Sequence, residues 1–339
     1  MGKSLFDPVE IRSFRMENRV VAVPMATRSF TVDGRPTDKT MEMYGKYAES
    51  RAGMVVVEHH AVHPWGRNRR EQPRLYGDAD AESLRPLTDL FRAAGTPVVA
   101  QINFAGSMTA DENLLREDDF EYVSPSGVKT PRDALRERPR PLEERQIAAI
   151  VEAFVRAAER AVRIAGYDGV QIHAAHGYLL GQFLSPLTNK REDAYGRTPK
   201  GRARFLYEIV DAVRSSCKDA LLSVRLGMAD HMPDEPMKGL SVDDTADVAR
   251  ELAALGVDYL SLSGNHCGFG DKRVGDDAYF APFARVVRDA VRGALPIDCA
   301  GGVRSRRTAE ELLAGGVCDL IGIGRPFWSE PGFLRTWRD

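Results

Sequence analysis

The chain has 339 residues, of which 43% are hydrophobic, so it can form either two domains or a single α/β barrel with insertions. Its 47 basic and 49 acidic residues give a net charge of −2 and are scattered along the sequence, which predicts no nucleic-acid partner. No apolar run reaches the ~20 residues that span a bilayer, no signal peptide is evident, and the four cysteines lack a C-x-x-C pair, so we expect a cytoplasmic protein without a membrane role or a metal site.

Short apolar runs rich in valine, isoleucine and leucine recur along the whole chain. Each run is nearly continuous rather than alternating, which is typical of strands that are covered on both faces in a parallel sheet. The runs occupy residues 19–25, 53–58, 97–102, 169–173, 220–226, 257–263, 295–302 and 318–325. We therefore expect these segments to be strands.

Helical patterns, with apolar residues spaced three and four apart, fill the intervals between these runs. They cover residues 38–52, 81–95, 144–166, 202–216, 243–256, 281–293 and 305–316. Several end in glycine, as helix C-termini do. Strand and helix alternate about eight times without a linker, which predicts a single (β/α)8 TIM barrel over residues 1–339. A doubly wound sheet is the alternative, and it is less favoured because no G-x-G-x-x-G follows the first strand.

One segment interrupts this alternation. Residues 104–141 form a long charged stretch after the third predicted strand. Loops of this length within a compact domain are uncommon and are usually functional. We therefore expect an insertion that forms a lid or a side subdomain of the barrel.

Barrel enzymes place their chemistry at the C-terminal ends of the strands, so the residues that follow each run belong to one surface. That surface is predicted to include Met25, Ala26, Glu58, His59, Gln101, His173, His176, Tyr178, Arg225, Ser263, Gly264, Gly301, Gly302, Gly324 and Arg325. Histidine and tyrosine side chains at a buried strand end must face a polar partner, because burying an unpaired polar group costs a few kcal/mol.

Glycines near the last two strands favour a phosphate site, because glycine lets backbone N–H groups approach an anion. Gly301 and Gly302 follow the seventh strand, and Gly324 follows the eighth, where Arg325 adds a guanidinium. Tight turns are the alternative role for these glycines. Arg225 lies within an apolar run, so it pairs either with a neighbouring carboxylate or with an anionic ligand.

These motifs carry a resemblance that covers nearly the whole chain. Residues 140–197, which include IHAAHGYLLGQFLSP, resemble the central signature of the old yellow enzyme family, the flavin-dependent ene-reductases built on a (β/α)8 barrel. The segment LFDPVEIRSFRMENRVVAVPM resembles the family's N-terminal hairpin and first strand, QINFAG its third strand end, SVRLG its fifth and GIGRPFWSEP its eighth. The resemblance therefore implies a hairpin before the barrel.

The resemblance also implies a bound FMN that is held by residues from several strand ends. These residues are Pro24, Met25, Ala26, His59, Gln101, Arg225, Gly301, Gly302, Gly324 and Arg325. The first three would lie against the flavin ring, Gln101 would hydrogen-bond its pyrimidine edge, and Arg225 would stabilise its negative charge after reduction. The glycines and Arg325 would hold the phosphate. Ala26 and His59 depart from most relatives, which carry threonine or cysteine at the first position and glycine or alanine at the second.

The same resemblance implies catalytic roles for three residues at the end of the fourth strand. His173 and His176 would donate hydrogen bonds to an oxygen of the substrate. A hydride would pass from the flavin to the β-carbon of an activated alkene, and Tyr178 would deliver a proton to the α-carbon. The implied substrates are small molecules: enones, enals, nitroalkenes or quinone-like compounds. The segment 265–280 is expected to border the mouth of this site.

Longer relatives continue with a cysteine-rich segment and nucleotide-binding domains that this sequence lacks. We therefore expect NADH or NADPH to reduce the flavin directly, and we expect a homo-oligomer, either a dimer or a tetramer. Two alternatives remain open. The chain could be another FMN barrel enzyme that acts with a separate reductase partner, or a flavin-binding protein without catalytic activity.

Overall fold

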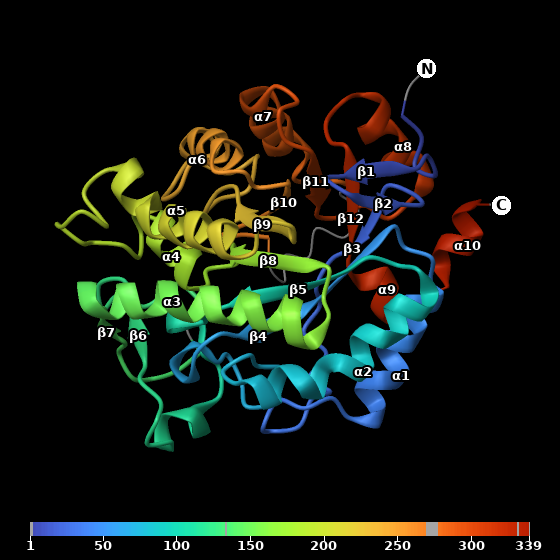
Figure 1. The fold of residues 1–339 in the computed structure, drawn as a ribbon. Helices are drawn as coiled ribbons and strands as arrows, with labels where there is room; N and C mark the ends of the chain where they lie inside the picture. The colour runs from blue at the N-terminus through green and yellow to red at the C-terminus, as the bar shows by residue number, and fades with distance from the viewer. Residues whose placement is uncertain (1–2, 133, 269–276, 331, 339) are drawn as a thin grey trace.

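The computed structural model, which describes residues 3–132, 134–268, 277–330 and 332–338, contains a closed barrel of parallel strands (Figure 1). In barrel order the strands are β3 (Val20–Ala22), β4 (Met54–Ala61), β5 (Val98–Asn103), β8 (Gly169–Ala174), β9 (Leu221–Gly227), β10 (Tyr259–Ser263), β11 (Ile297–Ala300) and β12 (Leu320–Ile323). Pairing of β12 with β3 closes the ring. The predicted (β/α)8 barrel is confirmed, and the closed ring excludes the doubly wound alternative.

Helices cover the outside of the barrel (Figure 1). The larger ones are α1 (Asp38–Glu49), α2 (Asp78–Ala94), α3 (Glu144–Arg160), α5 (Pro199–Ser216), α6 (Val242–Ala254), α7 (Ala281–Val291) and α8 (Arg306–Ala314). Shorter helices are α4 (Leu179–Leu184), α9 (Arg325–Ser329) and α10 (Phe333–Arg338). Within the described ranges, none of the helices combines the length and the apolar character needed to cross a membrane.

Several of these helices begin where a side chain caps the first backbone amides. Thr37, Thr198, Ser241 and Ser305 each accept a hydrogen bond from a backbone N–H in the first turn of the following helix. Such caps satisfy donors that have no partner within the helix. Local sequence therefore determines where the crossover helices start.

The predicted N-terminal hairpin is present and closes the barrel at the N-terminal ends of its strands. It consists of β1 (Val9–Ile11) and β2 (Phe14–Met16), paired antiparallel. Ile11 and Met16 pack with apolar side chains from the barrel interior, which are Val21, Val23, Met54, Val56, Val99, Leu221, Tyr259, Ala300 and Leu320. The hairpin therefore shields this end of the core from water, and the polar strand ends lie at the opposite end.

Residues 104–141 lie between β5 and α3 and have a small apolar core of their own. They include the 3-10 turns η2 (Gly106–Met108) and η3 (Glu112–Arg116) and a parallel pair formed by β6 (Val123–Ser124) and β7 (Arg140–Pro141). Leu114, Phe120, Tyr122 and Leu135 form the core. The Tyr122 hydroxyl donates to the Ser107 carbonyl at 3.1 Å.

Carboxylates fasten neighbouring strands together at the N-terminal end of the barrel. Asp168, Asp258 and Asp319 each precede a strand immediately, and each accepts the backbone N–H at the start of the preceding strand in the ring. The donors are Val98 at 2.7 Å, Leu222 at 2.7 Å and Ile297 at 3.1 Å. Asn18 joins β3 to β4 in a similar way: its side-chain amide donates to the Arg51 carbonyl at 2.8 Å.

Asp258 allows a direct test of this fastening. It also pairs with Arg214 at 2.5 Å, so Asp258→Ala leaves the buried Leu222 amide without its acceptor and removes the carboxylate partner of the Arg214 guanidinium, which keeps its backbone carbonyl acceptors. We expect the free energy of unfolding to fall by about 2–4 kcal/mol. Urea denaturation that follows circular dichroism measures this change. Asp211→Ala, at an exposed position on α5, is the control and should change stability by less than about 0.5 kcal/mol. Equal midpoints for the two variants would contradict the fastening role.

Candidate active site

Three predicted residues converge at the C-terminal end of β8. The ring centroid of His173 lies 5.0 Å from that of His176 and 4.8 Å from that of Tyr178. The ring of His59, from β4, lies 5.5 Å from the Tyr178 ring. The pairing of β4 with β5 shifts register between Val57 and His60, and this bulge contains His59. Bulges commonly re-aim side chains beside functional sites.

The turn after β8 is held by hydrogen bonds from the segment that follows β10 and from α4. The Asn265 side chain accepts the Gly177 N–H at 3.1 Å, and the Gln182 side chain donates to the Gly177 carbonyl at 2.7 Å. His176 adopts a φ of 62°, a left-handed conformation that is uncommon for a residue with a Cβ. Gly177 also has a positive φ, and a Cβ there would lie 2.7 Å from the His266 ring. These contacts fix the spacing of the histidines and the tyrosine.

Both histidines are neutral near pH 7, because burial lowers the pKa of His173 and of His176 well below the ordinary value and the Arg225 charge lowers both further. His176 Nε2 lies 2.8 Å from the Ser263 hydroxyl. His173 Nδ1 is buried and has no hydrogen-bond partner among the described residues. Burial raises the pKa of Tyr178 to about 12, so the phenol keeps its proton at neutral pH.

Arg225 points into the barrel from β9, next to His173 in the strand register. It is 5% exposed, and its Nε and Nη1 atoms lack partners among the described residues. Ser261 and Asp298 occupy the matching positions on the next two strands, and the Ser261 hydroxyl donates to Asp298 at 3.0 Å. Burial raises the pKa of Asp298 to about 7, while the Arg225 charge acts in the opposite direction. A guanidinium with free donors is suited to an anionic or carbonyl-rich ligand edge.

Gln101 belongs to a chain of hydrogen bonds across the barrel interior. Its side-chain amide donates to Gln171 at 2.9 Å, and the Gln171 amide donates to Ser223 and to Tyr259, each at 3.1 Å. Gln171 and Tyr259 are site neighbours that the sequence reasoning missed. They lie within apolar runs, where one polar residue carries no distinct signal.

The residues after β3 reach the strand ends beside β12. Met25 is half-buried, and a Cβ on Gly324 would lie 2.9 Å from the Met25 sulfur. The segment predicted to lie against the flavin ring therefore contacts the segment predicted to hold the phosphate. Pro24 is half-buried, while Ala26 is exposed. Thr27 anchors the segment, because its backbone N–H donates to the Glu58 carboxylate at 3.0 Å.

The predicted phosphate glycines lie together at the ends of β11 and β12. Gly301 and Gly302 have φ values of 148° and 82°, which residues with a Cβ rarely adopt. A Cβ on either residue would come within 2.7 Å of the Phe280 or Tyr279 ring. The Arg325 side chain is exposed and has no hydrogen bond or ion pair among the described residues. The geometry therefore leaves a positively charged, glycine-lined corner.

A cavity of about 280 Å³ opens beside Tyr178. It is lined by Ala26, Arg28, Glu58, His59, Asn68, Arg69, Glu71, Gln72, Met108, Ala110, Arg132, Ala134 and Tyr178. The insertion 104–141 thus contributes to the site wall. The sequence reasoning missed Arg28, Arg69 and Arg132. They lie in loops, and a loop sequence has no periodicity that shows where its side chains point.

His266 is a further neighbour that the sequence reasoning did not single out. Its ring lies against Gly177, and neither ring nitrogen has a partner among the described residues. It belongs to the segment 265–280, which we expected at the mouth of the site. Residues 269–276 of that segment lie outside the described residues.

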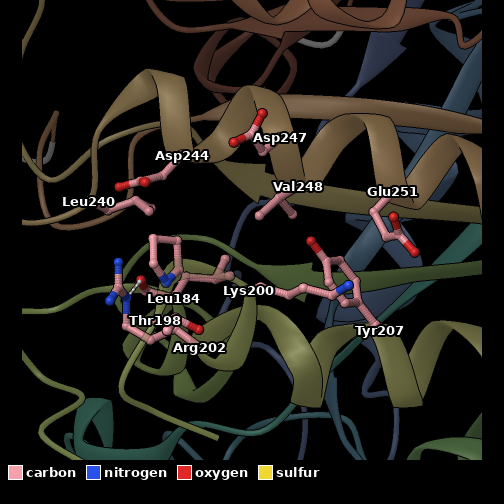
Figure 2. Close-up of a pocket in the computed structure, with 11 residues that line it drawn as sticks. Leu184, Thr198, Lys200, Arg202, Tyr207, Leu240, Asp244, Asp247, Val248 and Glu251 are labelled. Atoms are coloured by element: carbon pink, nitrogen blue, oxygen red, sulfur yellow. Dashed lines mark hydrogen bonds between the residues drawn. The ribbon is translucent and has the colours of Figure 1, made fainter.

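A second cavity, of about 360 Å³, lies away from the strand ends between α5 and α6 (Figure 2). Lys200 and Tyr207 on α5 face Asp247 and Glu251 on α6 across it. None of the predicted catalytic or cofactor residues lines this cavity. In the part of the chain that the structure describes, no group of three or more histidine, cysteine, aspartate or glutamate residues could hold a metal ion.

Comparison with known proteins places this site in a family. Residues 4–339 match the NADH:flavin oxidoreductase / NADH oxidase family. The chain is 33% identical over 339 residues to the NADPH dehydrogenase of Bacillus subtilis (strain 168), an alignment that covers 99% of this chain and 94% of that protein. It is also 33% identical over 334 residues to the NADPH dehydrogenase of Geobacillus sp. (strain WCH70), which covers 97% and 93% of the two chains.

Solved structures agree. The old yellow enzyme homologue from Zymomonas mobilis superposes with a TM-score of 0.83 at 27% identity and covers 99% of this chain and 92% of its own. Morphinone reductase gives a TM-score of 0.83 at 29% identity and covers 100% and 90%. The resemblance carried by the sequence motifs is therefore confirmed, and the chain is an oxidoreductase that belongs to the NADH:flavin oxidoreductase / NADH oxidase family.

Proposed function

We propose that this oxidoreductase binds FMN and uses NADH or NADPH to reduce the C=C bond of small activated alkenes such as enones and enals. The observation that carries the proposal is the cluster of His173, His176 and Tyr178 at the end of β8, beside Arg225, whose Nε and Nη1 atoms have no partner among the described residues. Neutral hydrogen-bond donors, a protonated phenol and a buried cation are what such a reduction requires around one position.

The residues present fit an FMN. Arg225 buries two donor atoms that have no partner in the described part of the chain, which costs free energy unless a ligand supplies acceptors. Gly301 and Gly302 have no Cβ to shield their backbone N–H groups, at positions where a Cβ would collide with the Phe280 or Tyr279 ring. Arg325 offers a guanidinium without a protein partner among the described residues. In this assignment Arg225 and Gln101 bind the ring edge, Pro24, Met25, Ala26 and His59 border the ring, and the glycines with Arg325 hold the phosphate.

When bound, FMN would supply the hydride that adds to the β-carbon of the alkene. The protein's part begins with the substrate oxygen. His173 is a neutral imidazole whose Nδ1 has no hydrogen-bond partner among the residues that the structure describes; it donates to that oxygen and draws electron density from the alkene. His176 is oriented by its bond with Ser263, so its ring is held in one position beside His173. The neutral state matters, since a neutral donor avoids the cost of a second buried cation beside Arg225.

Tyr178 completes the reduction by protonating the α-carbon. Its hydroxyl lines the cavity, and its pKa of about 12 keeps the proton available. Arg132 and Arg69 lower that pKa against the effect of burial, so they stabilise the phenolate that remains after the proton has left.

Flavin content provides the first test. The purified protein should be yellow with about one FMN per chain. Arg225→Ala should weaken FMN binding by about tenfold or more, because the ring edge loses its charged donor. Arg225→Lys should retain part of the affinity, since an ammonium keeps the charge without the planar fork. Fluorescence titration of apoprotein measures both. Colourless protein that cannot be reconstituted with FMN would contradict the assignment.

Anaerobic stopped-flow absorbance tests the overall reaction. NADH or NADPH should bleach the flavin band, and a cyclic enone added afterwards should restore it. If dithionite bleaches the flavin but neither nicotinamide does, the chain acts with a separate reductase partner. If oxygen restores the band but no activated alkene does, the reaction is not alkene reduction.

Replacement of Tyr178 separates proton delivery from substrate binding. Tyr178→Phe should slow reoxidation by an enone about 10²- to 10⁴-fold, because a general acid is lost, while phenol binding and reduction by nicotinamide persist. His173→Ala should instead weaken the binding of phenols. Tyr207→Phe, in the cavity between α5 and α6, is the matched control and should behave as wild type.

The pH profile adds a check on the same residue. Since the pKa of Tyr178 is about 12, the enone half-reaction should show no alkaline loss from phenol ionisation below about pH 10. Wild-type reoxidation rates in Tyr178→Phe would rule out the proton-donor role.

A further inference from the structure

We infer that the substrate carries an anionic group, a carboxylate or a phosphate, which Arg28, Arg69 and Arg132 bind in the cavity beside Tyr178. This inference rests on the proposed function, because it assumes that the alkene lies against Tyr178 and the histidines. It adds a second recognition element to that site.

The segment that follows β4 is rich in arginine, and only one of its arginines is left without a carboxylate. Arg67 pairs with Glu117 at 2.5 Å, Arg70 with Asp111 at 3.0 Å and Arg74 with Asp80 at 2.9 Å. Arg69 has no ion pair and no hydrogen bond among the described residues, and it is the one that lines the cavity. A partly buried guanidinium that the protein does not pair is available to a ligand.

Arg28 reaches the same cavity from the loop after β3. Glu58 accepts the N–H of the preceding residue, Thr27, which anchors the loop, and Arg28 itself adopts a φ of 51°. It likewise has no ion pair or hydrogen bond among the described residues. Arg132 approaches from the insertion 104–141, so three separate loops bring positive charge to one space.

These charges lie close to the chemistry. Burial raises the pKa of Tyr178, and the charges of Arg132 and Arg69 are the two largest opposing influences. Arg132 also lowers the pKa of His176 and of His266. Tyr178 and the three arginines line one cavity of about 280 Å³, so an anion bound by the arginines would lie within one small molecule's length of the proton donor.

The acidic residues of the cavity do not cancel this charge. Glu58 is committed to the Thr27 N–H and to the Tyr44 hydroxyl, which donates at 3.3 Å. Burial raises the pKa of Glu58 to about 7, so it is only partly ionised at neutral pH. Among the lining residues that the structure describes, Glu71 is the one other carboxylate, against the guanidinium groups of Arg28, Arg69 and Arg132. These described residues therefore carry more positive than negative charge.

The size of the cavity favours a compact acid. Its volume of about 280 Å³ lies just below the roughly 300–1,000 Å³ of sites that enclose drug-sized ligands. The phosphates of the nicotinamide reductant are a competing source of negative charge. The experiment therefore measures the reductive and the oxidative half-reactions separately.

A matched pair of probes tests the inference: 4-oxopent-2-enoate and its methyl ester, which share one enone and differ in one charge. For the wild-type holoenzyme, kcat/KM for the acid should exceed that for the ester by about tenfold or more. Added salt should reduce this ratio, because it screens a partly exposed charge pair. Arg69→Gln and Arg28→Gln should each lower the acid-to-ester ratio about tenfold, and Arg69→Glu should lower it further.

Arg70→Gln is the matched control, since Arg70 is adjacent in sequence but pairs with Asp111 outside the cavity. It should leave the acid-to-ester ratio unchanged. A wild-type ratio near one, or equal ratios in Arg69→Gln and Arg70→Gln, would overturn the inference and leave the proposed function intact. Slower flavin reduction by NADPH in Arg69→Gln, with an unchanged acid-to-ester ratio, would assign the arginines to the reductant and also overturn it.

A binding measurement decides the case in which neither enone is reduced and the proposed function itself fails. Flavin absorbance changes report the Kd of 4-hydroxybenzoate, of its methyl ester and of 4-hydroxyphenyl phosphate. The anions should bind about tenfold more tightly than the ester in the wild type, and this preference should disappear in Arg69→Gln. The tighter of the two anions identifies the group. No preference for either anion would overturn the inference.

Discussion

Arg225 places a guanidinium inside the barrel, 5% exposed, where two of its donor atoms have no partner among the described residues. Moving such a cation out of water costs several kcal/mol, and the interior must compensate for it. Polar side chains on the neighbouring strands, rather than a direct ion pair, surround this guanidinium. Asp298 and Ser261 follow Arg225 across two strands, and the chain from Gln101 through Gln171 to Tyr259 continues on the other side. The interior of the barrel is therefore partly polar, and the Arg225 charge stays available to a ligand.

Most of the fold could be predicted from the sequence, because strands and helices have different periods. The apolar runs at 97–102 and 220–226 match β5 and β9 within one residue at each end. Strand lengths were overestimated where apolar residues continue past the last ladder bond, as at 295–302, of which β11 keeps only Ile297–Ala300. A glycine, a proline or an arginine in such a run can mark where the strand ends. The hydrophobic pattern alone does not, because it carries no information about which backbone groups form ladder hydrogen bonds.

The site divides into a predictable and an unpredictable part for a physical reason. His173, Gln101 and Arg225 lie on strands, whose direction is fixed by alternation, so their convergence follows once the barrel is recognised. Arg28, Arg69 and Arg132 lie on loops, and their directions depend on contacts such as those of Thr27 with Glu58. The short motif around His173 and Tyr178 was informative because one turn carries both residues, whereas the cavity wall is assembled from segments far apart in the sequence.

The fastenings at the N-terminal end of the barrel divide the ring into four quarters. Asn18 joins β3 to β4, Asp168 joins β5 to β8, Asp258 joins β9 to β10, and Asp319 joins β11 to β12. Arg19 also donates to the Asp319 carbonyl at 3.1 Å and so links β12 to β3, where the natural termini lie. At the other three boundaries, between β4 and β5, β8 and β9, and β10 and β11, no described residue directly before a strand forms a fastening of this kind. New chain termini placed between two quarters would therefore keep both strands of every fastened pair in one continuous segment. A cut inside a quarter would separate, along the chain, two strands that a fastening joins. The molecule is suited to circular permutation at the quarter boundaries, with the loops of the candidate site undisturbed at the other end of the barrel.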